Sequence, residues 1–356
     1  MKSLHLIGSK HMGGAERWFG RFLPAMQRHG EAVEAVVRRN SELAHQLPPG
    51  LPTRHLGFRT VWDPLSRLEV SRLLASSDAP IVQTYMGRAT RLTRLPPGGG
   101  RVHVSRLGGY YKLDPFVHAH AWIGNTRGLC DWMIRGGLPA EKVFHITNFA
   151  DPARDVPPAE VDALRADIAL ADDDLLMVTA GRLLDVKGHR YLIDALARLP
   201  HELHGRRLRL AILGDGDLRA ALADQARQAG VGERVLLAGW QRDPAPWFRL
   251  ADLVVFPSRD PETLGNVILE SWAYGRPLVC TAFRGAREIA RHGEDAWIVP
   301  CDDAAALADG IRAVAGDAPL QQRLTAAGLR RVAQDFSEAT VIGQYRALYA
   351  DLLENR

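Results

Sequence analysis

Short apolar runs alternate with amphipathic stretches along the whole chain. Apolar runs bounded by Gly, Pro, Asn or Asp predict buried strands, whereas apolar positions three and four residues apart predict helices packed on a sheet. In the first half we expect strands at 3–9, 31–39, 80–85, 101–107, 121–126 and 143–148, and helices at 15–28 and 65–75. This alternation predicts an α/β fold with a parallel sheet wrapped by helices.

A second alternating set begins at residue 175. We expect its strands at 175–183, 208–216, 234–240, 252–258, 277–282 and 297–300, and its helices at 188–199, 217–229, 244–250, 265–274 and 303–315. Two such sets predict two doubly wound, Rossmann-like domains facing a central cleft at the carboxyl ends of their strands.

The domain boundaries follow from length and composition. A chain of 356 residues exceeds the usual size of one core, which favours two domains. Residues 151–174 are rich in Pro and Asp and lack a strand pattern, so we expect the connection there. The first domain is predicted to comprise residues 1–155, joined by an amphipathic C-terminal helix at about 337–356 that crosses back to it, and the second residues 156–336.

Charge is distributed unevenly between the halves. Residues 1–150 carry 20 Lys and Arg against 10 Asp and Glu, whereas the remainder carries 25 against 31. The first half is therefore expected to meet an anionic partner, such as a membrane surface, a phosphorylated glycan or nucleic acid. A generally arginine-rich composition is the alternative explanation.

Cysteine usage and apolar run lengths indicate the compartment. Cys130, Cys280 and Cys301 are widely spaced, which favours a reducing compartment over a disulfide scaffold or a zinc site. The N-terminal sequence resembles a first strand more than a signal peptide, and no apolar run approaches the ~18 residues of a membrane span. We expect a cytoplasmic protein.

Three segments that precede predicted helices are candidate phosphate sites, because helix N-termini expose unpaired amides and a partial positive charge. They are Gly13-Gly14, the loop carrying Arg182 and Lys187, and residues 263–266. Arg182 and Lys187 lie five residues apart across a turn, so both side chains can converge on one diphosphate. A Gly-Gly turn alone is more often simple geometry, and two cations can also mark a solvated loop.

Two glutamates bracket the start of the helix predicted at 265–274. Glu262 lies in the loop before the helix and Glu270 about one turn inside it, a span of roughly 10 Å. Carboxylates accept hydrogen bonds from vicinal hydroxyls, so Glu270 can hold a ribose and Glu262 a sugar, with the Gly265-Asn266 amides on phosphate between them. The buried face of this helix is expected to comprise Val267, Ile268 and Trp272.

Taken together, these motifs resemble the donor-binding domain of glycosyltransferase family 4, the retaining enzymes with the GT-B fold. The resemblance covers almost the whole chain. It implies that Arg182, Lys187 and Gly188 grip the donor diphosphate and that Glu262 and Glu270 form the family's E-x7-E motif. It further implies donor contacts from Gly13, Gly14, Trp240, Gln241, Asp243, Thr263, Leu264, Gly265 and Asn266.

The first half departs from the family pattern. Many members carry a V-H-x-x-H segment facing the donor sugar, whereas this chain has Arg106 in place of the second histidine. Either Arg106 or His103 faces the reacting centre, and His103 is equally compatible with a core histidine. Residues 105–116 are similar to enzymes that build lipopolysaccharide core or other surface glycans.

The resemblance implies retaining, metal-independent transfer of a sugar from a UDP- or GDP-linked donor to an anionic glycan or glycolipid acceptor. The implied reaction needs no cofactor, and nucleic acid is not an expected partner. We expect the protein to make peripheral contact with the cytoplasmic face of the inner membrane. Two acidic motifs are interpreted as structural. Residues Asp172–Asp174 resemble a metal site but are expected to be solvated, and Asp217 is expected to cap the helix that follows it.

Two other function classes remain as hypotheses. A GT-B nucleotide-sugar 2-epimerase would need a pair of catalytic carboxylates in the first domain, and the sequence offers no convincing pair. A non-catalytic anion- or nucleic-acid-binding protein would need aromatic residues interleaved with the basic ones, for which Tyr110, Tyr111 and Lys112 are a thin basis.

Overall fold

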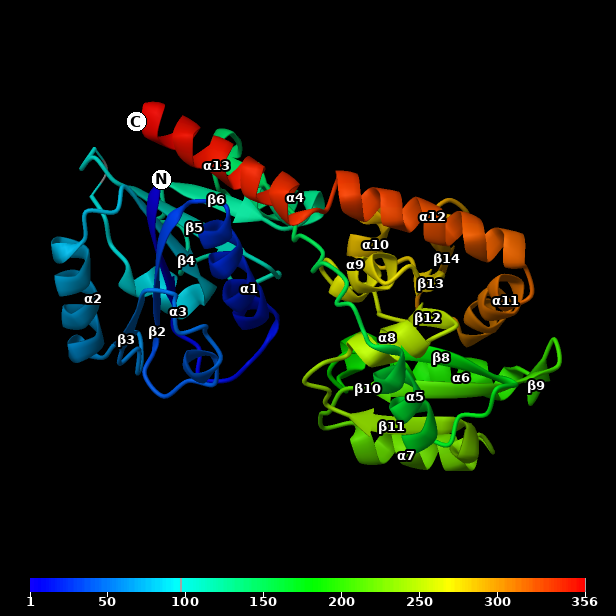
Figure 1. Ribbon diagram of the computed structural model, residues 1–356. Coiled ribbons are helices and arrows are strands. Elements are labelled where there is room, and N and C mark those ends of the chain that lie inside the picture. Colours follow the sequence, from blue (N-terminus) through cyan, green and yellow to red (C-terminus); the bar gives the residue numbers. More distant parts are fainter. Residues whose placement is uncertain (97, 356) are drawn as a thin grey trace. The chain divides into compact units, whose positions relative to one another are not determined.

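The computed structural model describes residues 1–96 and 98–355, which form two compact units (Figure 1). Unit 1 comprises Met1–Asn148 and Glu338–Arg356, and unit 2 comprises Phe149–Ser337. The division falls earlier than the boundary expected at residue 155, because Phe149 and Ala150 are already buried in unit 2. The Ala150 amide donates to the Phe336 carbonyl at 2.8 Å and so fixes the entry of the chain into that unit.

Unit 1 is built on a parallel sheet with the strand order β3-β2-β1-β4-β5-β6-β7. Its strands are β1 (Lys2–Ile7), β2 (Ala32–Arg38), β3 (Thr53–Leu56), β4 (Ile81–Tyr85), β5 (Val102–Leu107), β6 (Ala121–Gly124) and β7 (Val143–His145). The inner strands β1, β4 and β5 are buried almost throughout, which explains their continuous apolar runs in the sequence.

Helices cover the sheet of unit 1. They are α1 (Gly14–Arg28), α2 (Pro64–Ser76), α3 (Met86–Leu92), α4 (Arg127–Arg135) and α13 (Glu338–Glu354). The sequence pattern did not predict α3, α4 or strand β3. It did predict the return of α13, which is confirmed: α13 lies beside α1 (Figure 1), and Tyr349 donates to Gln83 of β4 at 2.7 Å.

Unit 2 repeats the architecture with the strand order β11-β10-β8-β12-β13-β14. Its strands are β8 (Asp174–Ala180), β9 (Glu202–Leu203), β10 (Arg206–Leu213), β11 (Val235–Gly239), β12 (Leu253–Phe256), β13 (Leu278–Thr281) and β14 (Trp297–Val299). The pairings along this order are parallel, and β9 adds a short antiparallel pairing to β10. Two Rossmann-like units were expected, and they are confirmed.

The helices of unit 2 are α5 (Pro158–Asp167), α6 (His189–Arg198), α7 (Arg219–Gln228), α8 (Ala245–Leu250), α9 (Asn266–Ala273), α10 (Arg284–Ile289), α11 (Ala304–Ala315) and α12 (Ala318–Gln334). The segment expected to hold the interdomain connection contains no strand before β8 but includes α5, and neither α10 nor α12 was predicted. Buried apolar side chains lie on both faces of the sheet, as a doubly wound fold requires.

Two interpretations of acidic residues were wrong. Asp217 does not cap α7, whose N-cap is Leu218. Asp172 and Asp173 are exposed, but Asp174 is buried as the first residue of β8. Its carboxylate lies 3.0 Å from the Nε atom of Arg207 on β10, so a cross-strand ion pair replaces the expected hydration.

The chain reverses its strand order at one point in each sheet, where ligands bind in doubly wound folds. In unit 1 this switch point lies between β1 and β4, and in unit 2 between β8 and β12. The loops that follow these strands are therefore the places to look for a site. Among the described residues, no helix combines the length and apolar character needed to cross a bilayer.

Candidate functional site at the switch point of unit 2

An ion pair joins the two loops at the switch point of unit 2. Lys187 follows β8 and Glu262 follows β12, and the Lys187 Nζ atom lies 2.6 Å from Glu262 Oε2. Both side chains are largely buried, with 20% and 15% exposure, so they attract each other more strongly than a surface pair would. Ser258 Oγ lies 3.3 Å from the same carboxylate oxygen and donates a second hydrogen bond to it.

The loop around Lys187 is held by close backbone packing. Gly188 has a φ of +65°, and a Cβ atom on it would lie 2.0 Å from the Pro257 carbonyl oxygen at the end of β12. Only glycine fits at this position, because a side chain would be strained and would also collide with backbone. Next to it, burial and the nearby Lys187 charge lower the pKa of His189 to about 4.

Arg259 fastens the same two loops from outside. Its guanidinium pairs with Asp185 of the first loop and with Asp302, the latter at 2.8 Å. The Arg259 amide also donates to the Val186 carbonyl at 2.8 Å. The relative position of Lys187 and Glu262 is therefore fixed by a network that the sequence analysis did not identify.

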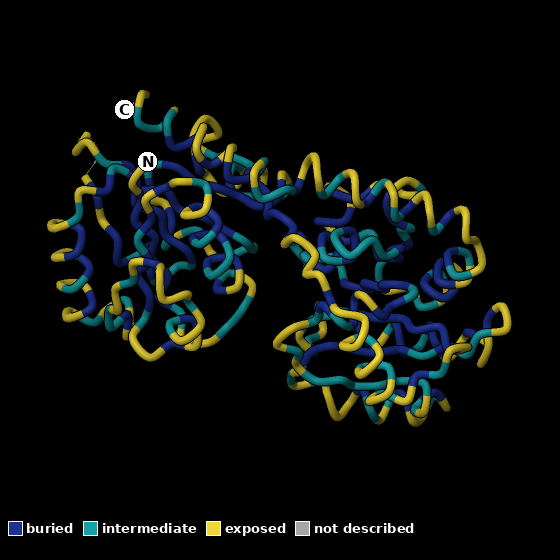
Figure 2. The backbone as a smooth tube through the Cα atoms, viewed as in Figure 1, coloured by how far each residue is buried: buried dark blue, intermediate teal, exposed yellow. Residues whose placement is uncertain are grey.

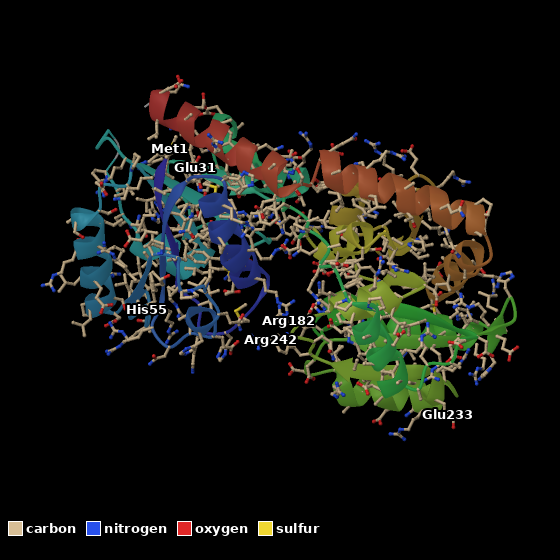
Figure 3. All side chains as sticks on the ribbon, in the orientation of Figure 1. Met1, Glu31, His55, Arg182, Glu233 and Arg242 are labelled. Atoms are coloured by element: carbon tan, nitrogen blue, oxygen red, sulfur yellow. The ribbon has the colours of Figure 1, made fainter. Side chains whose placement is uncertain are left out.

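Arg182 occupies the exposed start of the loop that follows β8, so its guanidinium is open to solvent (Figure 3). Arg242 lies in the loop after β11, at the same carboxyl edge of the sheet (Figure 3). Arg182 and Lys187 were expected to converge on one diphosphate, and both lie on this edge. Lys187 is paired with Glu262, whereas Arg182 projects from the exposed part of the loop.

The helix after Glu262 begins as the sequence pattern predicted. Gly265 precedes α9 with a φ of +76°, and a Cβ atom there would lie 2.5 Å from the Phe283 ring. Asn266 is the first helical residue, so its amide and those after it belong to the helix N-terminus. The expected buried residues Val267, Ile268 and Trp272 are buried, as is Leu264 before the helix, whereas Thr263 is half-buried.

Glu270 is half-buried on α9, and its carbonyl accepts from the amide of Tyr274, one turn further on, at 3.0 Å. Burial raises the pKa of Tyr274, and the negative charges of Asp243 and Glu270 raise it further. The Arg154 amide donates to the Tyr274 hydroxyl at 3.2 Å. Glu270 thus lies one turn before a tyrosine that contacts Arg154.

The loop after β11, expected to contact a nucleobase, is anchored by its own hydrogen bonds. Gln241 donates from Nε2 to the Ala238 carbonyl at 2.7 Å, and Asp243 accepts from the Ala245 amide at 2.9 Å. Asp243 also pairs with Arg154 at 2.9 Å. Trp240 is 55% exposed, which leaves its indole face available for stacking.

The loop after β1 leads to the glycines expected near phosphate. Gly13 precedes α1 in extended conformation, and Gly14 is the first helical residue. No described atom lies within 4 Å of the place that a Cβ atom on Gly14 would occupy. Glu42 fixes the loop by accepting from His11 Nδ1 and from the Met12 amide, both at 2.8 Å, and these bonds lower its pKa.

His103 lies in the core of unit 1. It is completely buried on β5, and its Nε2 atom lies 2.9 Å from the Thr84 hydroxyl on β4. The rings of His118 and His120 lie 5.5 and 6.4 Å away. Burial holds the pKa of His103 well below its ordinary value, and the neighbouring histidines lower it further.

Arg106 is buried among side chains of its own unit. Its Nε atom donates to the Tyr345 hydroxyl of α13 at 2.7 Å, and its Nη2 atom donates to Asn148 Oδ1 at 2.6 Å. The guanidinium carbon lies 4.4 Å from the Trp18 ring centroid, a cation–π contact. Arg106 therefore links β5, α1 and α13, and only 4% of its surface is exposed.

Several residues at these loops escaped the sequence analysis, chiefly Ser258, Arg259, Arg154 and Tyr274. Each contacts a predicted site residue or fixes its loop, but none belongs to a glycine-rich or charged motif. Ser258 and Arg259 could have been noticed because they follow β12 closely, whereas Arg154 and Tyr274 lie away from strand ends and gave no such signal. In the part of the chain that the structure describes, no three His, Cys, Asp or Glu side chains gather into a group that could hold a metal ion.

Solved structures share this fold over nearly the whole chain. HepE from Anabaena, in complex with UDP and glucose, matches with a TM-score of 0.84 at 21% identity, covering 99% of this chain and 100% of that one. WaaG, a glycosyltransferase involved in lipopolysaccharide biosynthesis, matches with a TM-score of 0.72 at 17% identity, covering 98% and 99%. These likenesses define the fold as GT-B.

Sequence relatives give the family. Residues 174–317 match the family described as "Glycosyl transferases group 1". The lipopolysaccharide core biosynthesis glycosyltransferase LpsE of Rhizobium meliloti is 32% identical over 355 residues, covering 98% of this chain and 99% of the relative. LpsD of the same organism is 28% identical over 355 residues, covering 98% of each. The chain belongs to the group 1 glycosyltransferases.

Proposed function

We propose that the protein transfers a sugar from a nucleotide-diphosphate sugar to a hydroxyl of a cell-envelope glycan, with retention at the anomeric carbon and without a bound metal ion. The observation that carries the proposal is the pair of Lys187 and Glu262 at the switch point of unit 2, 2.6 Å apart. A cation and a carboxylate at this point suit a ligand with a phosphate next to a polyhydroxyl group.

In this proposal, different residues of unit 2 bind different parts of the donor. Lys187 has three N–H donors, so it can hold Glu262 and a phosphate oxygen at once, and Arg182 would bind the diphosphate from the exposed side. The amides at the start of α9, after Gly265, would add the charge of a helix N-terminus. Glu262 would then accept from a sugar hydroxyl, and Glu270 from a ribose hydroxyl.

The chemistry requires stabilisation of the departing diphosphate. The acceptor oxygen bonds to the anomeric carbon, the bond from that carbon to the diphosphate oxygen breaks, and the acceptor proton passes to the diphosphate on the same face. Negative charge develops on the leaving group, and fixed cations and amides directed at such charge supply a large part of catalysis. The protein has these groups on ordered loops, which limits reorganisation during the reaction.

We infer a uridine nucleotide as the donor carrier. Asp243, the residue considered for a guanine edge, already accepts from the Ala245 amide and pairs with Arg154. HepE, a protein of the same fold, holds UDP. Trp240 is exposed beside this loop and would stack on the base.

The acceptor is proposed from the relatives and from charge. LpsE and LpsD act in lipopolysaccharide core biosynthesis, and the basic first 150 residues suit an anionic glycolipid acceptor. We propose that the protein meets this acceptor at the cytoplasmic face of the inner membrane, in peripheral contact with the lipid.

Calorimetric titration with UDP and GDP tests the donor site. UDP should bind the wild type more tightly than GDP, and Glu270→Ala should weaken it at least tenfold through loss of a charge-assisted hydrogen bond. Glu233→Ala is the matched control, because Glu233 precedes β11 at the opposite edge of the sheet (Figure 3). Equal binding by both glutamate variants would refute the assigned site.

Two further measurements test the mechanism. The anomeric configuration of the product, read by proton NMR, should match that of the donor sugar. Turnover should be unchanged by EDTA after dialysis. An inverted product or loss of turnover in EDTA would refute the corresponding part of the proposal.

A further inference from the structure

Neighbouring strands of unit 1 end in buried polar side chains. In the sheet, β5 lies beside β6, and the last residues that pair between them are Leu107 and Gly124. Gly108 and Asn125 come directly after these two and therefore occupy one row just beyond the sheet. Both strands are buried up to this row (Figure 2). The row belongs to the carboxyl edge of the sheet, where doubly wound folds bind ligands.

Arg106 brings a buried cation to this row, since only 4% of its surface is exposed. Its Nε atom donates to Tyr345 and its Nη2 atom to Asn148, which leaves Nη1 without a hydrogen-bond partner among the described residues. In the part of the chain that the structure describes, its remaining contact is the Trp18 ring, and no carboxylate pairs with it. A buried charge without a counter-charge is costly, and an anionic ligand would lower that cost.

Asn125 brings an amide to the same row. It is 5% exposed and directly precedes Thr126, the N-cap of α4, so the positive end of that helix dipole lies beside it. Within the described chain its Nδ2 atom donates to no group, and its buried Oδ1 atom and the buried Oγ1 atom of Thr147 have no partner. Buried polar groups are normally paired inside a protein. This row therefore keeps hydrogen-bonding capacity that the fold does not use.

Gly108 leaves room between the two side chains. A Cβ atom on it would lie 3.8 Å from Arg106 Nη1 and 3.9 Å from Asn125 Nδ2, which are ordinary contact distances. Apart from the adjoining residues of the chain, no other described heavy atom lies within 4 Å of that point. Gly108 is half-buried, so the place is reached from the surface of the unit. The two nitrogens thus border one small place that an oxygen-bearing group of a ligand can fill.

We propose that this place, which we name the Gly108 site, binds the carboxylate of an acidic sugar. The two oxygens of a carboxylate can accept one hydrogen bond from Arg106 Nη1 and one from Asn125 Nδ2. A carboxylate is favoured over a phosphate because one guanidinium balances its single negative charge. A phosphate monoester carries more negative charge than this site neutralises.

The acidic sugar belongs to one of the two substrates of glycosyl transfer, so this part of the inference rests on the proposed function. It is the acceptor's sugar if the glycan supplies the carboxylate, and the donor's sugar if the transferred unit is a uronic acid. Titrations with ligands of each kind separate the two sources. They also separate carboxylate recognition in unit 1 from UDP binding in unit 2.

Calorimetry of the full-length protein with matched neutral and acidic ligands tests the Gly108 site. The donor pair is UDP-glucose and UDP-glucuronate. The acceptor pair is methyl glucoside and methyl glucuronide, titrated with and without saturating UDP. The wild type should prefer the acidic member of a pair roughly tenfold or more, as charge-assisted hydrogen bonds in a buried site require. The pair that shows the preference identifies the substrate that carries the carboxylate.

Two variants and one control locate the preference. Gly108→Ala should abolish it, because the methyl group occupies the place of the carboxylate while making only ordinary contacts with the protein. Asn125→Asp should abolish it as well, because an acid of the same shape repels the ligand's charge. Gly50→Ala should retain it, since Gly50 precedes β3 at the opposite edge of the sheet and also has open space at its Cβ position. Circular dichroism establishes that each variant is folded.

The proposal is overturned if neither acidic ligand binds the wild type better than its neutral counterpart, or if both folded variants keep the preference. Tighter binding of glucose 6-phosphate than of methyl glucuronide would also overturn it, because the site would then select phosphate. If UDP does not bind but methyl glucuronide binds and Gly108→Ala abolishes that binding, the proposed donor site fails and the Gly108 site stands.

Discussion

Arg106 of β5 donates a hydrogen bond of 2.7 Å to the hydroxyl of Tyr345 on α13, across 239 positions of sequence. The contact is buried, and both partners also touch aromatic rings of α1: Arg106 lies over Trp18, and the Tyr345 ring centroid is 4.4 Å from that of Phe22. The last helix of the chain is thereby fastened into the core of the first unit. Loss of this bond would loosen α13.

Tyr345→Phe should destabilise the protein by about 1–3 kcal/mol, because it leaves a buried guanidinium donor without its acceptor. Urea denaturation followed by circular dichroism measures the effect. Tyr191→Phe is the matched control, since Tyr191 accepts from the exposed Arg190. Equal unfolding midpoints for Tyr345→Phe and wild type would contradict a structural role for Arg106.

Lys187→Ala should lower kcat/KM by roughly two to three orders of magnitude if, as proposed, Lys187 is the fixed cation that stabilises the departing diphosphate. Arg190→Ala serves as the control, because Arg190 lies three residues away, is exposed and pairs with Asp185 at 3.6 Å. Steady-state kinetics with the donor, together with UDP titration, separate loss of binding from loss of chemistry. Similar kinetics for the two variants would remove Lys187 from the site.

Acid should destabilise the protein below about pH 6.5. Burial lowers the pKa of His5 to about 3 and that of His189 to about 4, and it lowers the pKa of His103 as well. Between the folded and unfolded pKa values, these histidines bind protons in the unfolded chain but stay neutral in the folded protein. The free energy of unfolding is therefore highest above the unfolded pKa and decreases as the pH falls from there toward the folded pKa values. For His189 alone the loss at pH 5 is about 2 kcal/mol.

Urea denaturation at pH 7.5 and pH 5 measures this dependence. His189→Gln should reduce the difference between the two pH values, whereas replacement of the exposed His11 by Gln should not. An unchanged pH dependence in His189→Gln would show that His189 does not titrate as its burial requires.

Gly188→Ala should disrupt the proposed donor site, because the new Cβ atom would lie 2.0 Å from the Pro257 carbonyl oxygen and the residue has a φ of +65°. We expect a loss of several kcal/mol of stability in unit 2, or relaxation of the loop with loss of UDP binding. Thermal unfolding and calorimetry distinguish these outcomes. An alanine that changes neither would contradict the packing of this loop on β12.

Gly14→Ala, unlike Gly188→Ala, should be tolerated by the fold. Space for a Cβ atom is open there, and an alanine in the first turn of α1 should leave stability unchanged or raise it by about 0.4–1 kcal/mol. If turnover falls while the unfolding temperature is unchanged, the absence of a side chain at Gly14 is needed to leave room for the substrate. Unchanged turnover would instead make Gly14 a position of helix geometry only.

The sequence by itself determined the alternation of strands and helices and the edge of the sheet where the candidate site residues lie. Apolar runs and turn residues predicted the strands, and parallel strands place their following loops at one edge. Lys187, Gly188, Glu262 and Gly265 were therefore placed in these loops without a structure, and the start of α9 was predicted to within one residue. Local periodicity and local turn chemistry carry this information.

Only the tertiary structure decided which side chains meet. Lys187 and Glu262 are 75 positions apart, and Asp174 is buried by arginines of a neighbouring strand whose register the sequence does not state. Arg106 and His103 looked alike as site candidates, yet the first is enclosed by Asn148 and Tyr345 and the second by Thr84 and two histidines. Burial and pairing depend on contacts between distant segments, and a pattern read along the chain does not contain them.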